Sequence, residues 1–340
     1  MKKNIKNIIL VIVVLFLVIG AVKMIFFKGK TEITDLLDDG QEVSFKTIKP
    51  EENLAGISPK SVSYTTQGKI TLDKKIPVYK INNQKIDDVF IKKITESFGF
   101  KEEAVISEEN LIIYNNSENN TILDINKQTS TVKFSKNLLL YPMIKPMRVV
   151  STAEITEKLR GLLIKNFGLE QKVKMKVERI EYETLAGPRF LTSTKEKGNI
   201  VKIVANYEVL GFPVFSSTGF PIIARFSTDG NLLNISVDLP FNNIVKQADF
   251  SVKTEDELKI IPAEQYKIID VDGGKDYDLV STEEFVDGVN ITNGYLGYTY
   301  FPENKYLSPF VFFKSNSKLP SGPVVVILSV PALKQEEYYK

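Results

Sequence analysis

The segment Val150-Ser151-Thr152-Ala153-Glu154-Ile155 contains the clearest start of a helix in this sequence of 340 residues. Ser151 and Glu154 have the spacing of a capping box, in which the two residues satisfy each other's backbone N–H groups. Val150 and Ile155 stand at the flanking positions whose apolar contact fixes the first turn. Apolar residues then recur on one helical face, and a glycine follows them, at Leu159, Leu162, Leu163, Phe167 and Gly168. The sequence therefore predicts a helix from Ser151 to Phe167.

Strand-like stretches follow this helix. Apolar and polar residues alternate at 173–184, 199–210 and 220–238, which is the pattern of half-buried strands. Asp229-Gly230 interrupts the last stretch and predicts a hairpin turn there. The order of one helix followed by antiparallel strands defines a module at residues 147–240.

Two further modules of the same order are expected. Residues 61–146 are predicted to hold a helix near 84–98 and strands at 111–114, 121–125 and 131–134. In residues 262–333, Val280-Ser281-Thr282-Glu283-Glu284-Phe285 repeats the helix start at 150–155, and strands are predicted at 293–301, 306–314 and 322–330. Six residues can also match by chance, because any well-capped helix begins in this way. The expected fold class is α+β, with two or three helix-plus-antiparallel-sheet modules.

The two later modules resemble the PepSY-type modules of extracytoplasmic bacterial proteins. The resemblance is carried by residues 151–155, 225–230, 281–285, Gly294-Tyr295-Leu296-Gly297-Tyr298 and Leu307-Ser308-Pro309-Phe310-Val311. Together with the N-terminus, the layout is similar to the YycH/YycI family of membrane-anchored regulators of a cell-wall-sensing histidine kinase. The resemblance implies a regulatory role and no catalytic residues. Asp272-Gly273-Gly274 has no counterpart in it.

The N-terminus predicts a single-pass membrane anchor. Residues 8–27 are apolar apart from Lys23, and about 20 such residues cross a bilayer core. Lys23 lies near the end of this run, where its long side chain can reach the lipid–water interface. We expect a cytoplasmic tail at 1–7, a transmembrane helix at 8–27 that contacts the lipid bilayer, and a stalk at 28–60. A cleaved signal peptide with a weak site near Gly20 is the alternative.

Composition excludes several kinds of chemistry. The chain contains no Cys, no His and no Trp, so disulfides, thiolate nucleophiles and imidazole catalysis are ruled out. Of the 44 basic residues, four lie in residues 1–27, so the rest of the chain carries two more acidic than basic residues. A nucleic-acid-binding protein would show a basic excess, and we therefore expect no nucleic-acid partner.

An acidic cluster surrounds Gly273-Gly274. Its members, which could supply oxygen ligands to Ca²⁺, are Asp270, Asp272, Asp276 and Asp278. The spacing departs from the EF-hand pattern, because Lys275 stands where glycine is needed and Ser281 replaces the bidentate Glu. A solvated hairpin turn after a strand at 266–271 is the interpretation we adopt, with no metal ligand assigned.

Aromatic residues are concentrated at 295–313. The set consists of Tyr295, Tyr298, Tyr300, Phe301, Tyr306, Phe310, Phe312 and Phe313. Tyr298 and Tyr300 share one strand face, as do Phe310 and Phe312, because side chains alternate with a period of two. Exposed, these rings would form a peptide- or glycan-binding face; buried, they are sheet core, which is the interpretation we favour.

The sequence thus predicts a membrane-anchored, extracytoplasmic binding or regulatory protein, a sensor accessory or adaptor, without catalytic activity. No catalytic residue, metal ligand or cofactor is assigned, and the expected partner is another membrane or envelope protein. Two alternatives remain open: an envelope hydrolase that uses carboxylates or a Ser–Lys pair, and a structural envelope component.

Overall fold

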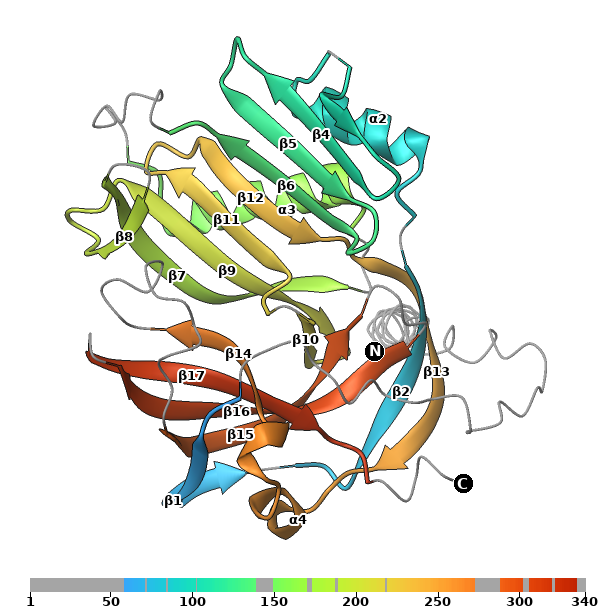
Figure 1. Cartoon of the computed structure of the whole chain (residues 1–340), viewed down its shortest axis with the longest axis vertical. Coiled ribbons are helices and arrows are strands. Elements are labelled where there is room, and N and C mark those ends of the chain that lie inside the picture. The colour runs from blue at the N-terminus through green and yellow to red at the C-terminus, as the bar shows by residue number, and fades with distance from the viewer. Residues whose placement is uncertain are drawn as a thin grey trace, which may run out of the picture. The chain divides into compact units, whose positions relative to one another are not determined.

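The computed structural model of the chain describes residues 58–70, 72–83, 85–101, 103–138, 149–169, 173–186, 189–217, 219–272, 288–301, 306–319 and 322–334 (Figure 1). All of them belong to one compact unit, Ile48–Lys340. The expected tail, transmembrane helix and nearly all of the stalk lie outside the described residues, as do Asp276, Asp278 and Ser281–Phe285.

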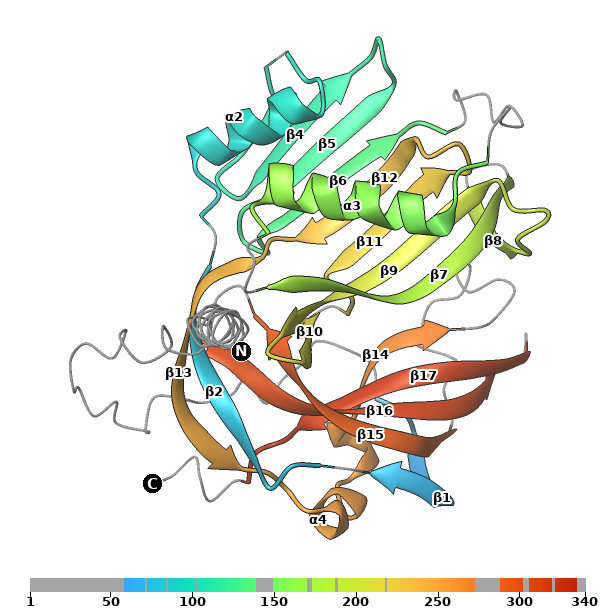
Figure 2. The ribbon, with the colours of Figure 1, turned by 180° about the vertical axis from the view of Figure 1, so that it is seen from behind.

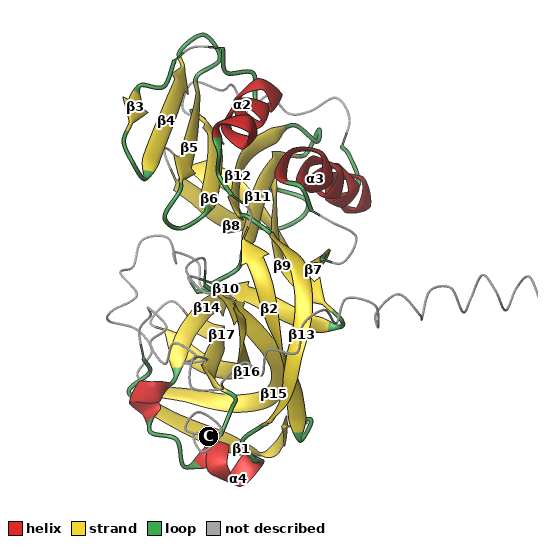
Figure 3. Ribbon diagram, turned by 90° about the vertical axis from the view of Figure 1, so that its right-hand side faces the viewer, coloured by secondary structure: helices red, strands yellow, loops and turns green. Residues whose placement is uncertain are grey.

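One antiparallel sheet carries two helices on one of its faces (Figures 2 and 3). Its helices are α2 (Asp88–Ser97) and α3 (Thr152–Phe167). In spatial order its strands are β3 (Ile106–Ser107), β4 (Leu111–Asn116), β5 (Thr121–Asn126), β6 (Thr131–Lys136), β12 (Leu232–Asp238), β11 (Ile222–Ser227), β9 (Ile200–Val209), β7 (Lys174–Ala186) and β8 (Arg189–Ser193). The β6–β12 pairing, with Val132 opposite Val237, joins two of the expected modules into a single sheet.

The helices form where the sequence predicts them. Ser151 accepts a hydrogen bond from the backbone N–H of Glu154, and Gly168 ends α3 in the left-handed conformation with a φ of 68°. The helix buries Ile155, Leu159 and Leu163 against the sheet. The two expected helices that lie within the described residues are therefore confirmed as α3 and α2, whereas the helix start expected at 280–285 lies outside them.

The remaining strands form a second group. They are β1 (Ser61–Ile70), β2 (Lys75–Asn83), β10 (Phe212–Ser216), β13 (Phe241–Ser251), β14 (Lys267–Asp272), β15 (Gly288–Tyr300), β16 (Tyr306–Leu319) and β17 (Gly322–Pro331), with the short helices α4 (Glu255–Lys259) and η2 (Ala263–Gln265). β15 pairs with β16 on one side and, in parallel, with β1 and β10 on the other. β2 pairs with β13 and with the start of β16.

Seven strands from the two groups follow one another around a ring. β7 pairs with β9, β9 with β10, β10 with β15, β15 with β16, β16 with β17, and β17 with β14. β14 then returns toward β7, where Arg179 of β7 forms an ion pair with Asp270 of β14. We call this arrangement the strand ring.

The predicted strands are confirmed, but the predicted fold class is wrong. The described residues are mostly β-sheet, and strands such as β1, β2, β10 and β13 fall outside the strand stretches that the sequence predicted. β1, β2 and β13 pair with partners far away in the sequence, for example Ser61 with Gly288, so no local pattern marks them. β10 pairs both with the adjacent β9 and with the distant β15. Helices cover part of one sheet only, and the rest of the core lies between strands.

The single-pass, signal-anchor arrangement is also contradicted. Among the residues that the structure describes, no helix combines the length and the apolar character required to span a membrane. Residues 8–27, from which the anchor was predicted, lie outside that part of the chain.

Candidate functional site

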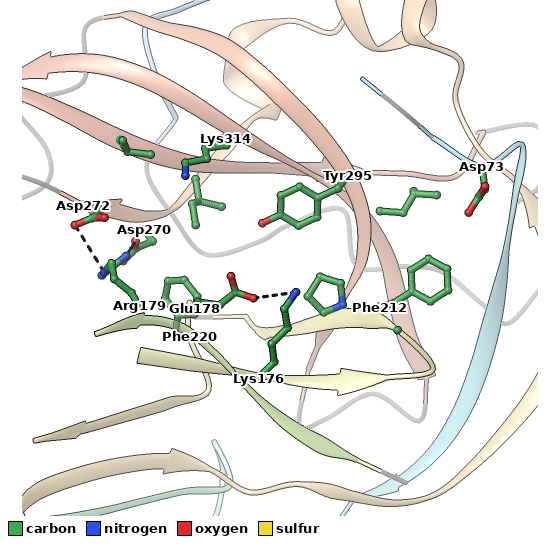
Figure 4. A pocket seen from close by; sticks show the side chains of 15 residues that line it. Asp73, Lys176, Glu178, Arg179, Phe212, Phe220, Asp270, Asp272, Tyr295 and Lys314 are labelled. Atoms are coloured by element: carbon green, nitrogen blue, oxygen red, sulfur yellow. Dashed lines mark hydrogen bonds and ion pairs between the residues drawn. The ribbon is translucent and has the colours of Figure 1, made fainter. Parts of the chain in front are cut away.

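The strand ring encloses a cavity of about 510 Å³ (Figure 4). Such a volume is within the range of small-molecule sites. Six strands of the ring contribute to its lining. The lining residues are Asp73, Lys176, Glu178, Arg179, Gly211, Phe212, Pro213, Phe220, Asp270, Asp272, Tyr295, Leu296, Lys314, Val325 and Ile327.

Aromatic rings form the apolar part of the cavity. Phe312 is fully buried and stacks on Tyr295 at 5.9 Å between ring centroids, so it covers one face of that ring. The partly buried Phe220 packs against the same cluster, which contains Phe215 and Phe310. Tyr295 points into the open centre of the cavity from β15 (Figure 4). The cavity therefore has a rigid aromatic surface supported from below by a packed core.

Arg179 organises the charged wall. Its Nη1 donates to Oδ2 of Asp270 at 2.5 Å, its Nε donates to Glu181, and Nε lies 3.7 Å from Oδ1 of Asp272. The guanidinium also lies over the Phe220 ring, 5.6 Å from its centroid. Arg179 thus interacts with three carboxylates, one on β7 and two on β14.

An ion-pair ladder continues from this wall across the sheet. Lys202 of β9 lies 2.9 Å from Glu181 and 3.7 Å from Glu183, and Arg225 of β11 donates from Nε to Glu183 at 2.6 Å. Glu181, Lys202 and Arg225 stand directly opposite one another in register, so their side chains share the face that the helices leave uncovered.

The ion pairs shift pKa values in opposite directions. Burial raises the pKa of Asp272, and the neighbouring Arg179 offsets only part of that rise. Burial would also raise the pKa of Glu181. The cations Lys202 and Arg179 outweigh this effect and hold the pKa of Glu181 below its ordinary value. Burial would lower the pKa of Arg179, yet its hydrogen bond to Asp270 raises that pKa above the usual range. The guanidinium therefore stays charged at any physiological pH.

Several polar groups of the ring have no partner among the described residues. The Tyr295 hydroxyl makes no hydrogen bond to them, although burial raises its pKa well above the usual value. The amide of Asn206 and the hydroxyls of Thr299 and Ser329 are fully buried and likewise unpaired. Asn206, Thr299 and Ser329 do not line the cavity, so of these groups only the Tyr295 hydroxyl can reach a molecule inside it.

The structure separates the predicted aromatic set into two parts. Six members are buried, which confirms the core interpretation for them: Tyr298, Tyr300, Phe301, Phe310, Phe312 and Phe313. Tyr298 and Tyr300 share one core cluster and Phe310 and Phe312 another, as their spacing predicts. Tyr295 is only partly buried and borders the cavity, and Tyr306 is partly buried elsewhere.

The predicted acidic cluster is only half described. Asp270 and Asp272 lie in the last part of β14, where both form ion pairs with Arg179. Within the described ranges, no group of three or more Asp or Glu side chains is arranged to hold a metal ion.

Sequence reasoning missed the residues that define the wall. Lys176, Glu178 and Arg179 belong to a stretch that was predicted as a strand, where alternating charges indicate only a solvated face. The partners of Arg179 on β14 lie more than 90 residues away, Asp270 at a separation of 91. The β-bulge between Val177 and Arg179 changes which side chains face the cavity, and the residue types at these positions do not indicate a bulge.

No family model and no curated protein matches the chain. A crystal structure of an uncharacterized protein from Eubacterium rectale ATCC 33656 is similar with a TM-score of 0.44 and 12% sequence identity, over 80% of this chain and 90% of that chain. The complex of MucA and MucB from Pseudomonas aeruginosa is similar with a TM-score of 0.10 and 9% identity, over 67% of this chain and 83% of that chain. Neither likeness is close enough to carry an argument about function.

Proposed function

We propose that this chain is a binding protein without catalytic activity that acts outside the cytoplasm, as an adaptor or sensor accessory of another envelope protein. The cavity of the strand ring takes up the ligand that it senses. The protein partner binds elsewhere on the molecule.

The pairing of the cavity's charges supports this proposal. Asp270 and Asp272 face Arg179, and Glu178 lies 3.5 Å from Lys176. A general acid or base must lie within hydrogen-bond reach of the substrate, and these carboxylates are each engaged with a cation of the same wall. The Tyr295 hydroxyl and the aromatic surface remain available for contact with a ligand. Such a site suits recognition better than turnover.

Two features of the sequence support the location and the regulatory role. The Lys-rich start and the apolar run at 8–27 have the composition of an export signal. The short motifs at 151–155 and 294–298 resemble modules of extracytoplasmic regulators.

Cross-linking in the intact cell envelope tests the adaptor role. The full-length protein should be recovered together with one discrete envelope protein, and a reciprocal pull-down with that protein should return this chain. Recovery of lipids and bulk polymer alone would contradict the adaptor role and favour a structural component. Release of soluble fragments from envelope polymers by the purified protein would instead favour the hydrolase.

A further inference from the structure

Three buried polar side chains lie behind the lining of the cavity. Asn206 stands directly opposite the cavity-lining Lys176, so both side chains lie on the same face of the sheet. Thr299 follows Tyr295 by four residues in a regular part of β15, and Ser329 follows Ile327 by two in β17. By the two-residue period of strands, these unpaired groups also face the ring interior. All three are neutral and lie behind the lining of the cavity, so the layer that supports the lining carries no charge of its own at these positions.

The charges of the cavity are nearly balanced. Among the described lining residues, three side chains are cationic and four are anionic. Arg179 and Lys176 are engaged with acids of the same wall. A strongly charged ligand would attract the side chains of one sign and repel those of the other. Its binding would therefore require these ion pairs to break. The balance therefore favours a ligand without net charge.

The surface of the cavity offers side chains rather than backbone. β15, β16 and β17 are each paired on both sides, so their backbone groups are already bonded. An extended peptide recognised by strand addition needs a free strand edge. β15, β16 and β17 lack one, and the unpaired edge of β14 is bridged to β7 by the ion pairs of Arg179 with Asp270 and Asp272. The Tyr295 ring, supported by Phe312 on one face, is placed to pack against the apolar face of a ring-shaped ligand.

From these observations we infer that the strand-ring cavity binds a short neutral oligosaccharide. A sugar presents many hydroxyl groups, each a donor and an acceptor, to the mixed polar wall, and an apolar C–H face to the aromatic surface. This inference rests on the proposed binding function and names its ligand class.

Binding of neutral oligosaccharides to the purified full-length protein, measured by titration calorimetry, tests the inference. The probes are chitotetraose, cellotetraose and mannotetraose, with an acidic oligogalacturonide and a mixture of unstructured peptides for comparison. Tyr295→Phe removes only the hydroxyl and keeps the ring in place. Tyr306→Phe is the matched control, because Tyr306 is also partly buried but does not line the cavity.

We expect at least one neutral probe to bind the wild-type protein and the Tyr306→Phe variant equally. Tyr295→Phe should bind it about tenfold more weakly, because a ligand hydrogen bond is lost. Lack of neutral-sugar binding, binding of only the acidic sugar or the peptides, or equal affinity of the two variants would overturn the inference. The cross-linking experiment tests the adaptor role separately. If it recovers a specific envelope partner while no neutral sugar binds, only the proposed ligand class is rejected.

Discussion

The guanidinium of Arg179 on β7 binds the carboxylate of Asp270 on β14, with 2.5 Å between Nη1 and Oδ2. Within the described residues these two strands share no backbone pairing, so side chains connect the ends of the strand ring. The same contact forms the charged wall of the cavity. Closure of the ring and formation of the binding site therefore depend on the ion pairs that Arg179 makes with β14.

Arg179→Met should lower the free energy of unfolding by about 2–3 kcal/mol, because it leaves Asp270 and Glu181 without their shared cation. The loss stays below the roughly 3–5 kcal/mol of fully buried pairs, since 17% of each side chain of the Arg179–Asp270 pair is exposed. Urea denaturation measures it. Arg160→Met is the matched control; its partner Glu157 is mostly exposed, and the change should cost less than about 1 kcal/mol. Equal losses in the two variants would contradict the role given to Arg179.

Glu257 should make stability depend on acid pH. The backbone N–H of Thr254 and the ammonium of Lys334 lower the pKa of this carboxyl to about 2 in the folded protein. The unfolded value is about 4.3, so the stabilisation is present above pH ~4.3 and disappears as the pH falls toward 2. Glu257→Gln should therefore be less stable than the wild type at neutral pH, with a difference that closes on acidification. The same substitution at the exposed Glu264 is the matched control. A constant stability difference between Glu257→Gln and the wild type across the pH range would argue against this assignment.

Gly297→Ala should destabilise the ring by about 1–3 kcal/mol through overpacking. A Cβ at Gly297 would lie 2.7 Å from the carbonyl oxygen of Pro213 on β10 and 2.9 Å from the Phe312 ring. Gly161→Ala, in an open position of α3, should instead gain up to about 1 kcal/mol from helix propensity. Thermal unfolding of the two variants distinguishes them, and a Gly297→Ala protein as stable as the wild type would show that β10 and β15 do not approach this closely.

Leu210→Asn should stabilise the β9–β10 hairpin by about 0.5–1 kcal/mol. Leu210 has a φ of 51°, which is costly for a bulky side chain, and its side chain is 69% exposed, so little packing is lost. Asn-Gly is the preferred pair for two-residue hairpins with this conformation. The measurement is the urea midpoint; a destabilised variant would contradict the backbone strain assigned to Leu210.

Local features of this protein could be predicted from the sequence, and pairings distant in sequence could not. Ser151 and Gly168 mark the ends of α3 because capping depends on neighbouring residues. The burial of Tyr298 and Phe310 followed from strand periodicity. The strands β1 and β15 pair across more than two hundred residues, and Arg179 meets Asp270 across 91. Neither pairing leaves a local pattern, so the sequence predicts neither the ring nor its cavity. Tyr295 belongs to the predicted aromatic set, but the core interpretation favoured for that set does not hold for it.

A single tryptophan at the cavity tests its role as a ligand site most directly, because the chain has no Trp of its own. Phe212→Trp places the fluorophore in the cavity lining, and Val149→Trp, 72% exposed and outside the lining, is the control. Titration with the neutral tetrasaccharides should change the emission of Phe212→Trp saturably and leave that of Val149→Trp unchanged. An unchanged spectrum of Phe212→Trp, or the same change in both variants, would contradict a ligand site within the strand ring.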